Sequence, residues 1–104
     1  MRDSVIELVT FSLVAGSDAM AFSAAAERTM NFLPQQPGFL RRELSVSATG
    51  EWADIVVWYD LGAALRAAER FRTADEAQDF NRMIDPATSR MRHLTVALAA
   101  PLRR

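Results

Sequence analysis

The chain of 104 residues has no cysteine, no lysine and a single histidine, and all twelve of its basic residues are arginine. Without cysteine there is no disulfide framework, no thiolate nucleophile and no zinc–thiolate centre. Without lysine, Schiff-base chemistry and covalent attachment of pyridoxal phosphate are excluded. One histidine would leave only carboxylates as further metal ligands. We therefore expect neither a metal ion nor another cofactor.

Long apolar runs and an excess of basic charge are also absent. No run approaches the roughly 18 apolar residues of a membrane helix, and the net charge of −1 creates no field that favours nucleic acid. The apolar stretch after Arg2 contains Glu7 and alternates like a strand, so it does not read as a signal sequence. We expect a cytoplasmic protein that binds neither membranes nor nucleic acid. Its arginine- and alanine-rich composition is typical of a GC-rich bacterium.

The length predicts a single domain over residues 1–104, with an ordered core of about residues 5–98. Hydrophobic periodicity predicts the element order βαββαβ. The predicted strands are Val5–Leu13, Phe39–Ser47, Trp52–Tyr59 and Met91–Leu98, of which the second has a polar face and is expected at a sheet edge. The first helix is expected from a cap at Ser17 to about Leu33, and the second from Leu61 to about Ile84 with a break near Arg72.

This order predicts an α+β, ferredoxin-like antiparallel sheet with both helices on one face. The opposite face is then uncovered, and an apolar patch on it usually means another subunit. We expect that face to carry five apolar side chains: Val9, Phe11, Val56, Trp58 and Met91. A homodimer packed sheet to sheet follows, with a cavity in each protomer either between the sheet and the helices or at the interface. Trp52, at the start of its strand, is expected on the surface.

Several short motifs recur in a known group of proteins. These are Pro37-Gly38-Phe39 at the entry to the second strand, Trp58-Tyr59-Asp60 at the end of the third, and Phe80 in the following helix. In these features the chain resembles the dimeric α+β-barrel superfamily, and within it the small proteins of the antibiotic-biosynthesis-monooxygenase type. The resemblance implies a dimeric α+β barrel with a ligand pocket. Its enzymes include cofactor-independent quinol monooxygenases, haem-degrading enzymes, and isomerases or cyclases of aromatic substrates.

The chain departs from this family at two positions that matter for chemistry. Many monooxygenase-type relatives carry a glutamate two residues before the tryptophan, where this chain has Val56. They also carry a histidine in the next helix, where this chain has only Ala64, Ala67, Ala68 and Glu69. The resemblance therefore implies the fold and the use of a pocket, and it does not supply the catalytic residues.

The residues themselves offer a small set of candidates. Any histidine-based acid–base step must use His93, although a hydrogen-bonded packing or interface role is the alternative. Asp54 shares a strand face with Trp58, and if buried it needs a partner, for which His93 or Arg92 are candidates. We take His93 and Asp54 as candidate catalytic residues. The candidate ligand-binding residues are Trp58, Phe11 and Met91.

Two functions remain open at this point. The first is cofactor-independent oxygenation or isomerisation of an aromatic, quinol-like small molecule. The second is a non-catalytic dimeric barrel that binds a small apolar ligand or acts as an accessory protein. The position of Glu7 also remains open: its side chain lies either in the interior or at an exposed end of the first strand.

Overall fold

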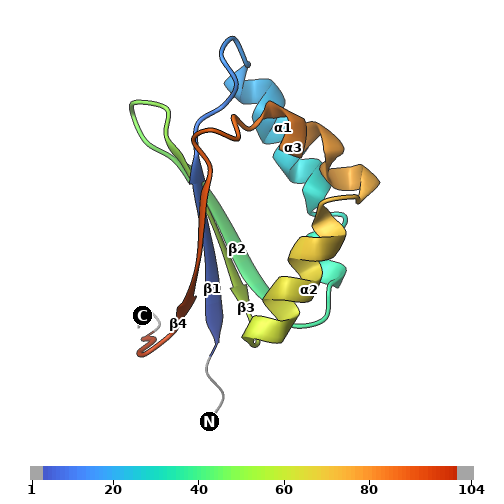
Figure 1. The fold of residues 1–104 in the computed structure, drawn as a ribbon, viewed down its shortest axis with the longest axis vertical. Helices are drawn as coiled ribbons and strands as arrows, with labels where there is room; N and C mark the ends of the chain where they lie inside the picture. Colours follow the sequence, from blue (N-terminus) through green and yellow to red (C-terminus); the bar gives the residue numbers. More distant parts are fainter. Residues whose placement is uncertain (1–3, 101–104) are drawn as a thin grey trace, which may run out of the picture.

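The computed structural model describes residues 4–100, which form one sheet and one layer of helices (Figure 1). The strands are β1 (Val5–Phe11), β2 (Phe39–Val46), β3 (Trp52–Trp58) and β4 (Arg90–Thr95). The α-helices are α1 (Ala19–Thr29), α2 (Leu61–Phe71) and α3 (Gln78–Met83), and the two short 3₁₀ helices are η1 (Leu33–Gln35) and η2 (Asp75–Ala77). The break expected in the second helix is present between α2 and η2.

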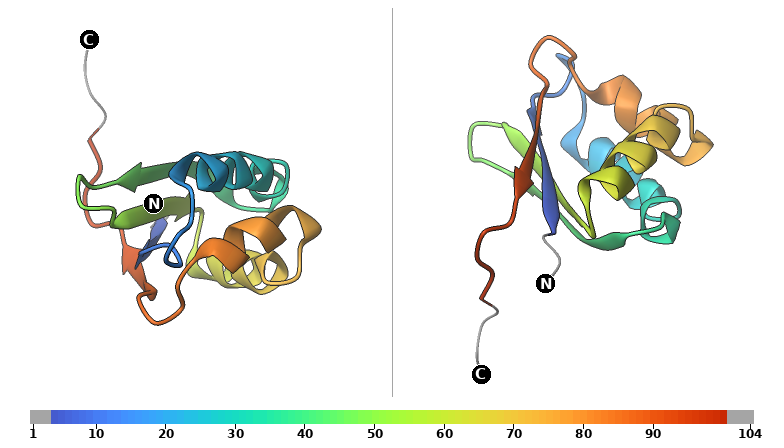
Figure 2. Two further views of the ribbon diagram at one scale, coloured as in Figure 1. Left: turned by 90° about the horizontal axis from the view of Figure 1, so that it is seen from above. Right: turned by 60° about the horizontal axis from the view of Figure 1, so that its bottom comes forward.

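The strand order in the sheet is β2-β3-β1-β4, and every neighbouring pair is antiparallel. All helices lie on one face of the sheet, which is plain when the molecule is turned (Figure 2). The α+β, ferredoxin-like fold expected from the sequence is therefore confirmed. The expected edge position of β2 is also confirmed.

Several predicted boundaries differ from the structure by one or more residues, and three of the differences involve local hydrogen bonds. The N-cap of α1 is Asp18, whose carboxylate accepts from the Met20 backbone N–H at 3.3 Å, and not Ser17. β1 ends at Phe11 because the backbone N–H of Ser12 donates to the Thr88 hydroxyl instead of to a neighbouring strand. β4 ends at Thr95, opposite Val5 at the start of β1. Beyond it, the Val96 backbone N–H still donates to the Ser4 carbonyl at 2.9 Å, and residues 97–98 lie outside the strand.

The expectation about the uncovered face was wrong. Register pairs Glu7 with Val56 and Val9 with Asp54, which puts both residues of each pair on the same face as Trp58 and Met91. That face is the one the helices cover. Both faces of β1 and β3 carry apolar side chains, so alternation alone did not reveal which face points to the helices. The uncovered face instead carries Ile6, Leu8, Ile55, Val57 and Leu94.

Aromatic rings build the core at one end of the covered face. Phe22 of α1 stacks on Phe80 of α3 with ring centroids 4.8 Å apart, and it meets Trp52 edge to face at the same distance. Trp52 is only 7% exposed, so its expected surface position was wrong. The reason is that α1 crosses over the start of β3 and brings Phe22 onto the indole, which buries a large apolar area.

Small residues set the spacing between α2 and the sheet at the other end. Ala63, Ala64 and Ala67 are buried against Trp58, Val56 and Leu33. Gly38 lies beneath α2 with φ +89°, and its carbonyl accepts from the Tyr59 N–H at 2.7 Å. A Cβ at Gly38 would lie 2.5 Å from the Cβ of Ala63, so the turn and the helix approach as closely as they do only with glycine there.

We expect Gly38→Ala to destabilise the protein by about 3–4 kcal/mol, because alanine would be strained at positive φ and would also clash with Ala63. Gly50 has the same φ, but nothing lies within 4 Å of a Cβ built there. Gly50→Ala is therefore the matched control, with an expected loss of about 1 kcal/mol. Urea unfolding measures both, and equal losses would contradict the close approach of α2 to the turn.

Candidate active site

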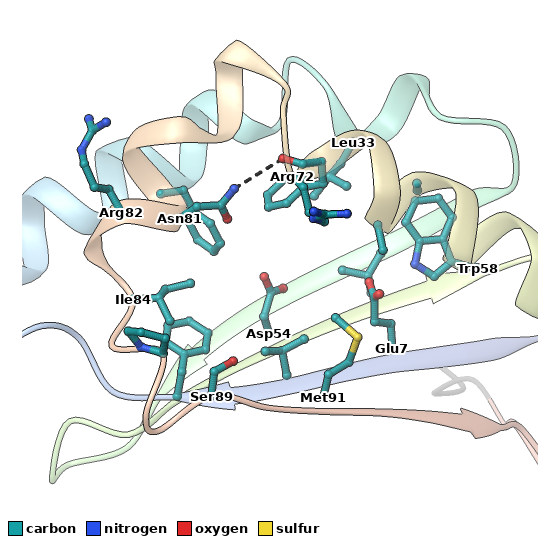
Figure 3. Close-up of a pocket in the computed structure, with 18 residues that line it drawn as sticks. Glu7, Leu33, Asp54, Trp58, Arg72, Asn81, Arg82, Ile84, Ser89 and Met91 are labelled. Carbon is teal, nitrogen blue, oxygen red and sulfur yellow. Dashed lines mark hydrogen bonds between the residues drawn. The ribbon is translucent and has the colours of Figure 1, made fainter.

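A cavity of about 690 Å³ lies between the sheet and the helices (Figure 3). Its floor comes from β1, β3 and β4, its roof from α2 and α3, and one end wall from the loop that contains Pro86 and Ser89. The cavity exists because α2 presents Ala67 and Ala68 to the sheet, and these side chains are too short to fill the space beneath them. A volume of this size is typical of small-molecule sites.

Three polar side chains meet on the cavity floor at the end nearest α2. Glu7 lies directly opposite His93 in the neighbouring strand, and the carboxylate Oε2 is 3.4 Å from the imidazole Nε2. The indole nitrogen of Trp58 points toward the same carboxylate (Figure 3). Glu7 is 8% exposed and Trp58 is 1% exposed. Strand register thus brings together a carboxylate, an imidazole and an indole N–H from three different strands.

The buried polar atoms of this group lie near one another but form no close hydrogen bond. Within the described residues, Glu7 Oε2, Trp58 Nε1 and His93 Nε2 are the buried side-chain nitrogen and oxygen atoms for which no protein partner is in place. Native proteins satisfy most such atoms, and each exception requires an explanation. A ligand that offers a hydroxyl group could both donate to the carboxylate and accept from the indole N–H.

Burial raises the pKa of Glu7 above the ordinary value of 4.5. A positive charge on His93 and the nearby indole N–H of Trp58 lower the pKa of Glu7, while the negative charge of Asp54 raises it. The net pKa is raised because removal from water outweighs the attraction of His93. Once ionised, a carboxylate with a raised pKa is a stronger base than one in water.

Asp54 is held by a partner that the sequence did not reveal. Arg42 Nε and Nη2 donate to the two carboxylate oxygens at 3.0 and 2.8 Å, and Nη1 donates to the Thr29 hydroxyl at 2.6 Å. The Arg42 guanidinium also lies 5.4 Å from the centre of the Phe80 ring. The expected partners His93 and Arg92 were wrong, since His93 pairs with Glu7 and Arg92 belongs to the uncovered face. The signal for Arg42 was its place among the apolar residues of β2, in phase with Leu44.

The candidates from the sequence fall into two groups. Asp54, Trp58, Phe11 and Met91 line the cavity, with Met91 half exposed at its β4 side. His93 reaches the floor through its contact with Glu7. Sequence reasoning left Glu7 undecided, and it missed Arg42 together with two polar residues of the roof, Arg72 and Asn81.

No group of three or more histidine, aspartate or glutamate side chains within residues 4–100 is arranged to hold a metal ion. In the same part of the chain, no helix is both long enough and apolar enough to cross a membrane.

Comparison with known proteins gives matches among solved structures, whereas no family model and no curated protein matches the sequence. The chain is similar to a variant of SnoaB, a cofactor-independent oxygenase from Streptomyces nogalater, with a TM-score of 0.77, 24% identity and coverage of 96% of this chain and 99% of that one. The chain has the fold of the antibiotic-biosynthesis-monooxygenase-like α+β barrels.

Two further structures support this conclusion. A putative antibiotic biosynthesis monooxygenase from Nitrosomonas europaea has a TM-score of 0.72 at 12% identity, and the match covers 93% of each chain. A putative monooxygenase from Shewanella loihica has a TM-score of 0.65 at 19% identity, covering 95% of this chain and all of that one. The resemblance inferred from Pro37-Gly38-Phe39 and Trp58 is confirmed at the level of the fold.

The raised pKa of Glu7 makes a prediction about stability. The folded protein holds the Glu7 proton to higher pH than the unfolded chain does, so this contribution to stability is complete below about pH 4.5 and is lost as pH rises through the folded-state pKa. Glu7→Gln removes it. In urea unfolding, we expect the variant to gain stability relative to the wild type as pH rises from 4 and then to level off. Glu51→Gln makes the same change at an exposed site and is the control. A stability difference from the wild type that is independent of pH for both variants would contradict the burial argument.

Proposed function

We propose that the protein catalyses cofactor-independent oxygenation of an electron-rich, quinol-like aromatic molecule. The observation that carries this proposal is the group of Glu7, His93 and Trp58. Glu7 and Trp58 line the cavity, His93 lies 3.4 Å from the Glu7 carboxylate, and Glu7 Oε2, Trp58 Nε1 and His93 Nε2 are buried without a close hydrogen bond. The similar fold of a cofactor-independent oxygenase adds support. An aromatic ring fits between the apolar side chains of Phe11, Val56 and Met91, which all line the cavity.

The first step of the proposed reaction is removal of a proton from the substrate. Glu7, with His93 beside it, accepts the proton from a phenolic hydroxyl or from an acidic methylene group. The Trp58 N–H then donates a hydrogen bond to the oxygen that becomes negative, which stabilises the anion in a site shielded from water. The resulting carbanion is the electron donor to O₂, so the substrate itself supplies all the electrons.

The overall reaction balances without a further reductant. For an anthrone, the ring methylene loses two hydrogen atoms and gains one oxygen atom to become a carbonyl, and the second oxygen atom of O₂ leaves as water. Asp54 has both oxygens engaged by Arg42, so we assign its part in catalysis to its charge, which helps to raise the pKa of Glu7. Proton transfer then rests on Glu7 and His93.

A non-catalytic binding protein is the second candidate function. It is favoured by the alanines that α2 turns toward the cavity, where many relatives with oxygenase activity carry a histidine. In this case, an aromatic ligand occupies the cavity and contacts Trp58 without being consumed.

Oxygen uptake with an anthrone substrate separates the two functions. We expect catalysed uptake by the wild type, and a fall in kcat of about 100-fold in Glu7→Gln and in His93→Ala, because each removes part of the proton acceptor. Trp58→Phe should lower kcat by about 10-fold through loss of one hydrogen bond to the anion. Glu51→Gln makes the same chemical change at an exposed site and should be unaffected. Uptake no faster with the wild type than with the Glu7 and His93 variants would leave the binding function.

The proposal includes a homodimer formed through the uncovered face of the sheet. This face carries Ile6, Leu8, Ile55, Val57 and Leu94, and no helix within residues 4–100 covers it (Figure 2). A chain of 104 residues has little core of its own, so burial of these side chains against a second copy would add substantially to its stability.

Light scattering tests the homodimer. We expect a mass of twice the 11.6 kDa of one chain, and dissociation to that single mass in Ile55→Glu, because a carboxylate in the middle of an apolar interface is desolvated without a partner. Ala21→Glu places the same charge on the exposed side of α1 and should leave the dimer intact. A wild-type mass of one chain at all concentrations would refute the sheet-to-sheet model.

A further inference from the structure

Arg72 lies at the rim of the cavity, where α2 ends. It is the C-cap residue of this helix, and its side chain lines the cavity. Figure 3 shows its guanidinium below the helical roof, over the space above Asp54 and Glu7. It forms an ion pair with Glu69, three residues earlier, at 3.2 Å between side chains that are 72% and 75% exposed. Such a pair contributes little to stability, so Arg72 can change partners at low cost.

The charges around the cavity are arranged unevenly between floor and roof. The floor carries the carboxyl groups of Glu7 and Asp54, and Arg42 neutralises Asp54 from the α1 side. The roof carries Arg72 and the amide of Asn81 (Figure 3). Arg82 also lines the cavity, but its guanidinium is paired with Asp79 of α3. Between floor and roof the walls are apolar, as at Phe71 and Ile84.

This arrangement dictates the orientation of a ligand that has an anionic group. On the floor, a carboxylate would meet the carboxyl group of Glu7 and that of Asp54, which is already paired with Arg42, and it would lose its hydration. At the rim it would keep part of its water and meet a guanidinium, whose planar fork matches the two oxygens of a carboxylate. The uncharged hydroxyl end of the same ligand is the end that suits Glu7 and Trp58.

We propose that Arg72 binds a carboxylate substituent of the ligand at the cavity rim, and that this contact directs the hydroxyl end of the aromatic ring toward Glu7 and Trp58. The substrate class is then a hydroxylated aromatic carboxylate. This inference rests on the proposed function for the identity of the site, but it concerns binding and orientation and not the reaction with O₂. Arg72 is a specificity-determining residue in this account.

Calorimetric titration with two probes tests the inference. One is 6-hydroxy-2-naphthoate, and the other is its methyl ester, which has the same ring and hydroxyl group but no charge. We expect the wild type to bind the acid more tightly, and Arg72→Gln to weaken acid binding about 10-fold while ester binding changes less than about 2-fold. Arg72→Lys should keep part of the preference, since it retains the charge and loses the fork.

Arg66→Gln is the matched control, because Arg66 is an exposed arginine of the same helix that does not line the cavity. It should leave both affinities unchanged. The inference is overturned if Arg72→Gln weakens both probes equally, if Arg66→Gln has the same effect, or if the wild type fails to prefer the acid. These outcomes are independent of oxygen uptake, so a protein that binds the acid through Arg72 without consuming O₂ would refute the oxygenase function alone.

Discussion

The ion pair between Arg42 and Asp54 joins every layer of this molecule. Arg42 comes from the edge strand β2 and Asp54 from β3, while the guanidinium also reaches Thr29 of α1 and the ring of Phe80 in α3. Both side chains are almost fully buried, at 4% and 11% exposure. Such a pair is maintained only when its hydrogen bonds are complete, because either charge alone would cost several kcal/mol in this setting.

The position of this pair also decides the character of the cavity. The free side of the Asp54 carboxyl group faces the cavity, since Arg42 approaches it from the α1 side. The cavity floor therefore presents carboxylate oxygens, while Arg42 balances the charge of Asp54 from behind. Glu7 is buried on the same face and senses that charge, which adds to the rise in its pKa. A structural ion pair and a candidate base are thus linked through the field across the sheet.

The sequence was sufficient for the local elements and insufficient for their arrangement. Alternation in β3 correctly grouped Trp52, Asp54, Val56 and Trp58 on one face, because the period of a strand is strict. Alternation did not show which face the helices cover, because Ile6 and Leu8 are as apolar as the residues that proved to be inside. That choice depends on where Phe22 of α1 can pack, which is a property of the whole fold.

For the candidate site, too, local patterns identified single residues but not the contacts between them. Trp58, Asp54 and Met91 were found from their strand phases, but the meeting of Glu7 with His93 depends on β4 lying beside β1. These residues are separated by most of the chain, and no local pattern encodes their pairing. Arg42 shares its strand face with Leu44, but its pairing with Asp54 depends on β2 lying beside β3 in this register, which no local pattern of β2 encodes.

The strand register also bears on the missing glutamate two residues before Trp58, where this chain has Val56. Many relatives with oxygenase activity carry it at the position of Val56, and Glu7 is the residue directly opposite Val56 in β1. Directly opposed residues on one sheet face have Cβ atoms about 5 Å apart, so a carboxylate from β1 reaches nearly the same part of the cavity floor as one from β3 would. His93 likewise enters from β4 instead of from α2. A carboxyl group and an imidazole are therefore present at this end of the sheet, supplied by β1 and β4, and they are the groups to which we assign proton transfer in the proposed reaction.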